Sequence, residues 1–271
     1  MLITYNSMGE FADHVDSLWK AGRSRRSVMD EGDWNGNVTP IQVLQYCREG
    51  NEQLAADAQA IIDNLEAQMP MTSGIAMVRS PFGGRVNYGD WQAGSPTPMR
   101  RRTKRVFDNA PIKVVVSITS SASIDKDTIN KRGAAILAFL LQAQNIRPID
   151  LWLLVELDGH SNGAEDGSVY QMIKVDSQPF AIGQAAFGLC HPAMGRMMGM
   201  TVADQYGYSG RWAADYLLPN YSDLRRQRLG LEPQDILIKE CHRSDPLIDN
   251  PIAWINEQLT KISETTNEEK I

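Results

Sequence analysis

Two apolar runs that bracket a helical segment constrain the fold of this chain more than any other feature. Residues 112–118 (IKVVVSI) and 151–157 (LWLLVEL) are nearly continuous apolar runs, which are typical of strands covered on both faces. Between them, apolar residues from Ile129 to Leu141 recur with the period of a helix. A strand, a helix and a strand in succession form a βαβ unit. The sequence therefore predicts an α/β fold with a mixed or parallel sheet flanked by helices.

The first 70 residues carry helix signals. Thr39 can cap a helix, Pro40 fits the first helical position, and Gln42 stands where a capping box needs an amide. From Asn51 to Met69, apolar residues recur at helical spacing. We therefore expect a helical amino-terminal region over residues 1–70.

Composition divides the rest of the chain into three regions. Residues 71–110 are rich in Gly, Pro and Ser, and they predict an extended or looped arm rather than helices. Residues 111–263 form the expected α/β core, with further strands at 169–175 and 235–240 and further helices at 180–200 and from Pro251 onward. Residues 264–271 are polar, and we expect a flexible tail there.

Charge is distributed unevenly along the chain. The net charge is −6, but residues 1–99 carry 7 basic and 12 acidic side chains, whereas residues 100–150 carry 10 and 4. Residues 151–271 are acidic again, with 10 basic and 17 acidic side chains. The middle segment is thus a basic island in an acidic chain.

The sequence shows no sign of membrane insertion or export. No window of about 18 consecutive apolar residues occurs, and the amino terminus lacks the basic-then-apolar layout of a secretory signal. Three widely spaced cysteines cannot form a disulfide framework, so reduced thiols are expected. We expect a soluble, intracellular protein with no membrane partner.

The strongest functional signal is a run of positive charges in the basic island. Its members are Arg100, Arg101, Arg102, Lys104 and Arg105. These charges repel one another, so they gain from lying together only near a polyanion or an acidic surface. Phosphates would make sequence-independent contacts with them, and Tyr88 and Trp91 could stack on unpaired bases. The alternatives are an acidic protein partner, the acidic amino-terminal region of this chain, and an ordinary solvated face.

Common catalytic and metal-binding signatures are absent from the sequence. It has no Gly-x-Ser-x-Gly, no Walker motif, no Gly-x-Gly-x-x-Gly and no His-Glu-x-x-His. The dipeptides Cys190-His191 and Cys241-His242 match each other, but structural zinc sites usually pair ligands two to four residues apart. We therefore expect no metal, no cofactor and no enzymatic activity.

Several short motifs resemble a family of phage-encoded proteins known as a domain of unknown function. The matching stretches are Trp34-x-Gly36, Arg48-Glu49-Gly50, residues 84–90, residues 94–99, residues 131–138, and His191-Pro192-Ala193 with Arg196. The resemblance implies a bacteriophage origin and a compact α/β fold. It implies no catalytic residues. For a soluble phage-encoded protein we expect a location in the host cytoplasm.

The βαβ unit also looks like the first half of a von Willebrand factor A domain. That family ends its first strand in Asp-x-Ser-x-Ser, whose carboxylate and hydroxyls help to hold Mg²⁺. Ser121 and Ser123 match this motif, but Thr119 replaces the Asp, so the resemblance implies a degenerate Rossmann-like or von Willebrand factor A-like core without a metal.

We therefore expect a phage-encoded, non-enzymatic protein that binds single-stranded nucleic acid in replication or transcription complexes. The alternatives are a phage assembly or structural module that binds an acidic phage or host protein, and a metal-dependent hydrolase. The hydrolase would use Ser121, Ser123 and the acidic loop that contains Asp158, Glu165 and Asp166.

Overall fold

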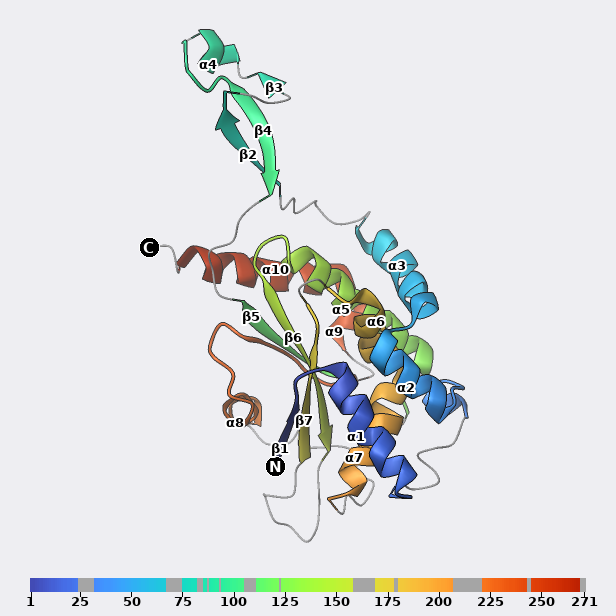
Figure 1. Cartoon of the computed structure of the whole chain (residues 1–271). Coiled ribbons are helices and arrows are strands. Elements are labelled where there is room, and N and C mark those ends of the chain that lie inside the picture. Colours follow the sequence, from blue (N-terminus) through green and yellow to red (C-terminus); the bar gives the residue numbers. More distant parts are fainter. Residues whose placement is uncertain are drawn as a thin grey trace.

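The computed structural model contains two separate sheets (Figure 1). It describes residues 1–23, 32–66, 75–81, 85–86, 88–92, 94–104, 111–121, 123–157, 169–177, 180–206, 221–242 and 245–268. The larger sheet is mixed, and helices cover it; we call this part the body. Its five strands, in spatial order, are β1 (Leu2–Tyr5), β7 (Val169–Val175), β6 (Ile149–Leu157), β5 (Ile112–Ser117) and β8 (Ile236–Ile238). The predicted α/β class is confirmed.

The predicted βαβ unit forms the centre of this sheet. β5 pairs in parallel with β6, and α5 (Lys126–Ala143) lies between them in the chain. Asp125 caps α5, because its carboxylate accepts a hydrogen bond from the backbone N–H of Thr128 at 2.7 Å. β8 also pairs in parallel with β5, so both strands end at the same edge of the sheet. We call this edge, residues 118–121 and 239–242, the carboxyl edge.

The remaining strands give the sheet its mixed character. β7 runs antiparallel to β6, and β1 pairs in parallel with β7. β1 lies within residues 1–70, for which only helices were expected. Four residues are too few to show a period, and their strand conformation depends on pairing with β7, which is distant in sequence.

The two helices predicted in the amino-terminal region are present. α2 (Pro40–Glu49) begins with the predicted capping box: the N–H of Gln42 donates to the Thr39 hydroxyl at 3.2 Å, and the Gln42 amide oxygen accepts from the N–H of Thr39 at 2.9 Å. α3 (Glu52–Glu66) follows directly. A further helix that the sequence analysis did not identify, α1 (Met8–Lys20), precedes both.

Shorter elements and a long carboxyl-terminal helix complete the body. They are η2 (Asp33–Asn35), α6 (Ile182–Cys190), the π-helical η3 (Met194–Gly199), α7 (Met200–Asp204), α8 (Tyr221–Arg228), α9 (Pro246–Asp249) and α10 (Pro251–Glu268). Residues 264–268 continue α10, although a flexible tail was expected from residue 264. The apolar face of α10, with Ile255, Leu259 and Ile262, is buried in the core and holds the helix on the body.

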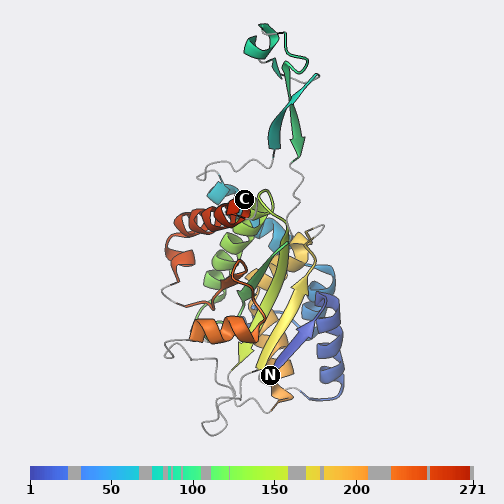
Figure 2. The same cartoon turned by 90° about the vertical axis from the view of Figure 1, so that its left-hand side faces the viewer.

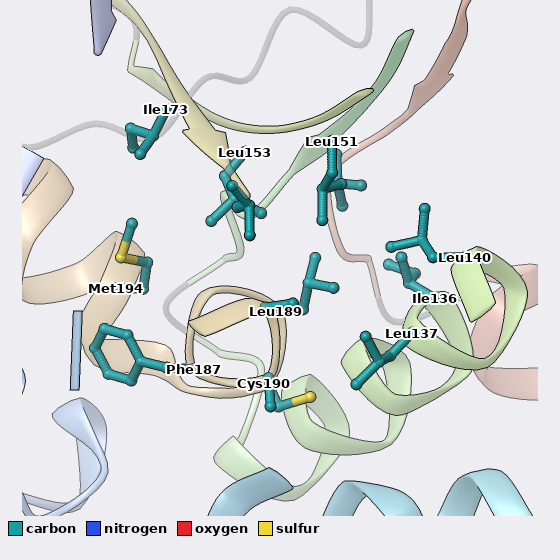
Figure 3. Packing of buried hydrophobic residues seen from close by; sticks show 14 of the residues in the cluster. Ile136, Leu137, Leu140, Leu151, Leu153, Ile173, Phe187, Leu189, Cys190 and Met194 are labelled. Atoms are coloured by element: carbon teal, nitrogen blue, oxygen red, sulfur yellow. The ribbon is translucent and has the colours of Figure 1, made fainter. Parts of the chain in front are cut away.

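The main hydrophobic core lies between one face of the sheet and helices α5 and α6 (Figure 3). Its side chains in Figure 3 include Ile136, Leu137 and Leu140 of α5, Phe187, Leu189 and Cys190 of α6, Leu151 and Leu153 of β6, Ile173 of β7, and Met194. Gly133 allows α5 and α6 to approach closely, because a Cβ there would lie 2.4 Å from the carbonyl oxygen of Leu189. A smaller cluster that includes Val115, Leu154 and Leu229 covers the opposite face. Burial on both faces explains the continuous apolar runs.

The second sheet forms in the region where an extended arm was expected. It contains β2 (Ile75–Ser80), β3 (Arg85–Val86) and β4 (Met99–Lys104), all antiparallel, with β4 in the middle. The short helix α4 (Tyr88–Gln92) lies between β3 and β4 in the chain. We call these four elements the arm sheet. In both views it projects from one end of the body (Figures 1 and 2).

Two further expectations concern membranes and thiols. Within the described ranges, no helix is both long enough and apolar enough to cross a membrane. Cys47, Cys190 and Cys241 are buried free thiols, as the odd number and wide spacing of the cysteines had predicted.

Candidate nucleic-acid interface

The basic run occupies the central strand of the arm sheet. Arg100, Arg101, Arg102 and Lys104 all lie in β4, whereas Arg105 lies outside the described residues. Because successive residues of a strand belong to opposite faces, the run is divided between two faces. Positions 100, 102 and 104 share one face, and position 101 lies on the other. The sequence showed one linear cluster, but the fold separates it.

Strand pairing adds two basic residues that the sequence analysis did not identify. Arg79 of β2 and Arg85 of β3 are each directly opposite Arg100 of β4. Both are isolated charges in the sequence, which have no basic neighbour within five residues. No signal in the sequence could link them to the basic run, because the link is the register of three strands.

The two predicted aromatic residues lie together in α4. Tyr88 begins this helix, and the side chain of Trp91, three residues later, is 62% exposed. Gly94 follows with a φ of 68°, a left-handed conformation that glycine adopts readily, and its N–H donates to the carbonyl oxygen of Trp91 at 3.1 Å. A large exposed aromatic side chain in a short, hydrogen-bonded helix is available for stacking.

The arm sheet lies apart from the acidic amino-terminal helices. In both views α1, α2 and α3 pack on the body, whereas β4 lies in the projecting sheet (Figures 1 and 2). This arrangement argues against the alternative in which the amino-terminal region of the same chain neutralises the basic run.

The carboxyl edge of the body, with the start of the loop that follows β5, contains Thr119, Ser121 and Ser123. Thr119 is buried, and its hydroxyl accepts from the N–H of Glu156 at 3.0 Å and donates to the carbonyl oxygen of the same residue at 3.3 Å. Ser121 and Ser123 are exposed, and their hydroxyl oxygens lie 3.0 Å apart. The Thr119 hydroxyl therefore joins β5 to the backbone of β6.

A buried arginine holds the loop that contains Ser121. Arg196 of η3 donates to the backbone carbonyl oxygens of Ser121 at 3.1 Å and Ile124 at 2.6 Å. It also donates to that of Trp34 at 2.9 Å, and its guanidinium lies 5.1 Å from the centre of the Trp34 ring. Burial lowers the pKa of this guanidinium below its ordinary value. The arginine connects three segments that are distant in sequence.

Motifs that carried the family resemblance converge around this arginine. Gly36 has a φ of 83°, and a Cβ there would lie 2.8 Å from the imidazole of His191 and 3.2 Å from Pro192. Burial lowers the pKa of His191 to about 4. The backbone N–H of Ala193 donates to its Nδ1 at 3.2 Å. Trp34, Gly36, His191 and Arg196 thus form a packing contact inside the body.

Only part of the predicted hydrolase site lies within the described residues, namely Ser121 and Ser123. Asp158, Glu165 and Asp166 lie outside the described residues. Across the described ranges, no group of three or more His, Cys, Asp or Glu side chains could hold a metal ion. Cys241 pairs with Ser120 through a backbone β-bridge, and the Cys190 thiol lies against α5 at Gly133.

The basic residues of α8 have structural partners. Arg225 is buried, and it forms ion pairs with Glu156 of β6 and with Glu240, the latter at 2.7 Å. Arg226 donates to the carbonyl oxygen of Asp235 at 3.1 Å. These contacts attach α8 to the sheet, so Arg225 and Arg226 have a structural role in the body.

Comparison with known proteins gives one family match. The model of a family described as a domain of unknown function, DUF7192, matches residues 1–262. No curated protein and no solved structure matches the chain.

Proposed function

This chain belongs to the DUF7192 family, a domain of unknown function, and we propose that it is a non-enzymatic protein that binds single-stranded nucleic acid through its arm sheet. The observation that carries the proposal is the position of the basic run. Four of its five residues form the central strand of a sheet that projects away from the acidic body (Figure 1). A polyanion could therefore reach the strand without approaching the acidic helices.

The chemistry of the arm sheet fits a sequence-independent ligand. Arginine and lysine contact backbone phosphates whatever the base, and each contact releases counterions. The exposed Trp91 supplies a ring on which an unpaired base can stack. Bases inside a duplex are not available for such stacking, which favours a single strand.

The resemblance to phage-encoded proteins supports a role in phage replication or transcription complexes, in the host cytoplasm. The βαβ unit and the Ser121–Ser123 loop at the carboxyl edge support a degenerate von Willebrand factor A-like body. In that body the Thr119 hydroxyl is hydrogen-bonded to the backbone of Glu156. Von Willebrand factor A domains have a metal-binding carboxylate at this position. This use of Thr119 leaves the hydrolase alternative with less support than binding.

Binding to fluorescent oligothymidylate, compared with a duplex of equal length, tests the proposal. Trp91→Ala should weaken single-strand binding at least about fivefold, since base–aromatic stacking contributes roughly 1–3 kcal/mol per base. It should change duplex binding little. The double variant Arg100→Glu/Arg102→Glu should remove binding to both.

A matched control has the same change of charge on the body. In Lys20→Glu/Lys126→Glu, two exposed lysines are reversed, and each forms only a surface ion pair. This variant should bind oligothymidylate as the wild type does. If the wild type binds no oligonucleotide at low salt, while the arm reversals disrupt a complex with an acidic protein, the ligand is that protein and the proposal is wrong.

A further inference from the structure

Three arginines form a row across the arm sheet. Arg100 lies in the central strand, Arg79 is its direct partner on one side, and Arg85 is its direct partner on the other. Neighbouring strands are about 4.8 Å apart, so the three backbone positions span about 10 Å. The row brings together residues from three separate stretches of sequence.

The same face continues along β4 toward its carboxyl end. Arg102 and Lys104 follow Arg100 at alternate positions, so each lies about 7 Å further along the strand. One face of the arm sheet therefore has five basic positions, which we call the cationic face: Arg79, Arg85, Arg100, Arg102 and Lys104. The other face has one basic position, Arg101. Its other positions are Ala76, Val78, Ser80, Val86, Met99 and Thr103.

Repulsion between the three positive charges of this row favours the binding of an anionic ligand. Like charges directly opposite each other on neighbouring strands destabilise a sheet. Arg100 has such a neighbour on both sides. Phosphate groups bound at this row would offset the repulsion between its positive charges.

We infer that the cationic face is the phosphate-binding surface of this protein, that Arg79 and Arg85 belong to it, and that Arg101 does not. The inference rests on the proposed nucleic-acid function and assigns its contacts. Basic residues on three β-strands would contact several phosphates along a single-stranded nucleic acid. Trp91 lies in the chain between β3 and β4, so the stacking residue adjoins the end of the face that carries Arg85 and Arg100.

Neutral single substitutions, measured by the salt dependence of oligothymidylate binding, test the assignment. For single strands the slope of log Kobs against log salt is about −0.7 per phosphate contact, so five contacts give about −3.5. Wild-type affinity should fall about 100-fold between 50 and 200 mM salt. Arg79→Gln and Arg85→Gln should each reduce the slope by about 0.7, as Arg100→Gln does.

Arg101→Gln is the matched control, since it removes the same charge from the neighbouring residue of the same strand. It should leave both slope and affinity at wild-type values. Amide hydrogen exchange gives a second readout: in the free protein, Arg100→Gln should slow exchange in β2 and β4, because it removes the repulsion within the row. A purely structural role for Arg100 would give faster exchange.

The outcomes separate this inference from the proposed function. Arg101→Gln could weaken binding as much as Arg100→Gln, or Arg79→Gln and Arg85→Gln could have no effect. Either result would show that the consecutive basic residues of β4 bind the ligand, without regard to the face of the sheet. The inference is then wrong although the nucleic-acid function stands. If the wild type binds no oligothymidylate at 50 mM salt, the proposed function itself fails.

Discussion

The hydroxyl of Thr119 is bonded to the backbone of Glu156 twice, accepting from its N–H at 3.0 Å and donating to its carbonyl oxygen at 3.3 Å. This buried residue therefore extends the contact between β5 and β6 to the second residue beyond the end of β5. The Thr119 hydroxyl is thus used for bonding to the backbone of the neighbouring strand.

Thr119→Val should destabilise the fold by about 1–3 kcal/mol, because it leaves two buried backbone groups of Glu156 without these bonds. Thr119→Ser keeps the hydroxyl and should cost less. Urea unfolding measures both as shifts of the midpoint at constant m value. A larger loss of stability for Thr119→Ser than for Thr119→Val would show that the methyl group, rather than the hydroxyl, contributes the stability.

Divalent cations should leave the thermal stability unchanged. A ligand stabilises a fold only by binding its native state, and the Thr119 hydroxyl is already bonded to Glu156. Millimolar Mg²⁺ or Mn²⁺ should therefore not shift the melting temperature in differential scanning fluorimetry. A saturable rise of several degrees that Ser121→Ala abolishes would instead support the hydrolase alternative.

Arg225→Met should cost about 3–5 kcal/mol at neutral pH, because it leaves the carboxylates of Glu156 and Glu240 without their buried counter-charge. Burial alone would raise the pKa of Glu240, but the Arg225 charge and the hydrogen bonds to this carboxylate, including those from Arg225 and His242, together lower the pKa below its ordinary value of 4.5. The ionised pair thus stabilises the fold above pH 4.5, and this contribution is lost as the pH falls further.

The difference in unfolding free energy between Arg225→Met and the wild type should therefore narrow below pH 4.5. Arg228→Met is the control, since this more exposed arginine lies in the same helix; it should change stability by no more than about 0.5 kcal/mol. A difference that stays constant with pH would show that lost packing, rather than lost charge, destabilises the Arg225 variant.

His191 should make the fold sensitive to mild acid. Burial lowers its pKa from 6.5 to about 4, so between these values the unfolded chain takes up a proton that the folded chain does not. The wild type should lose stability as the pH falls from 6.5 toward 4. His191→Gln removes this proton uptake, so urea midpoints should depend less on pH in that window. Parallel curves for the two proteins would contradict the assignment.

The features that could be predicted from the sequence are local ones. The βαβ unit and the capping box of Thr39 and Gln42 were predicted because period and cap residues are encoded within one segment. β1 was not predicted, because four residues carry no period and their strand partner is β7. The arm sheet likewise depends on pairing between residues 75–80, 85–86 and 99–104, for which the Gly- and Pro-rich composition gave no register.

The roles of the charged residues also depend on contacts between distant segments, so they could not be predicted from the local sequence. Arg196 and Arg225 are buried and bind carbonyl oxygens or carboxylates, but in the sequence they resemble surface arginines. Arg79 and Arg85 are isolated in sequence and become neighbours of Arg100 only through strand pairing. Sequence composition could identify the basic run, whereas its division between two faces required the structure.

Photo-crosslinking of the intact chain to oligothymidylate, with the linked peptides identified by mass spectrometry, tests the central claim most directly. The account predicts crosslinks in peptides of the arm sheet, including the one that contains Trp91, and their loss in Arg100→Glu/Arg102→Glu. Crosslinks confined to peptides of the body, or none at 50 mM salt, would contradict the claim that the arm sheet binds single-stranded nucleic acid.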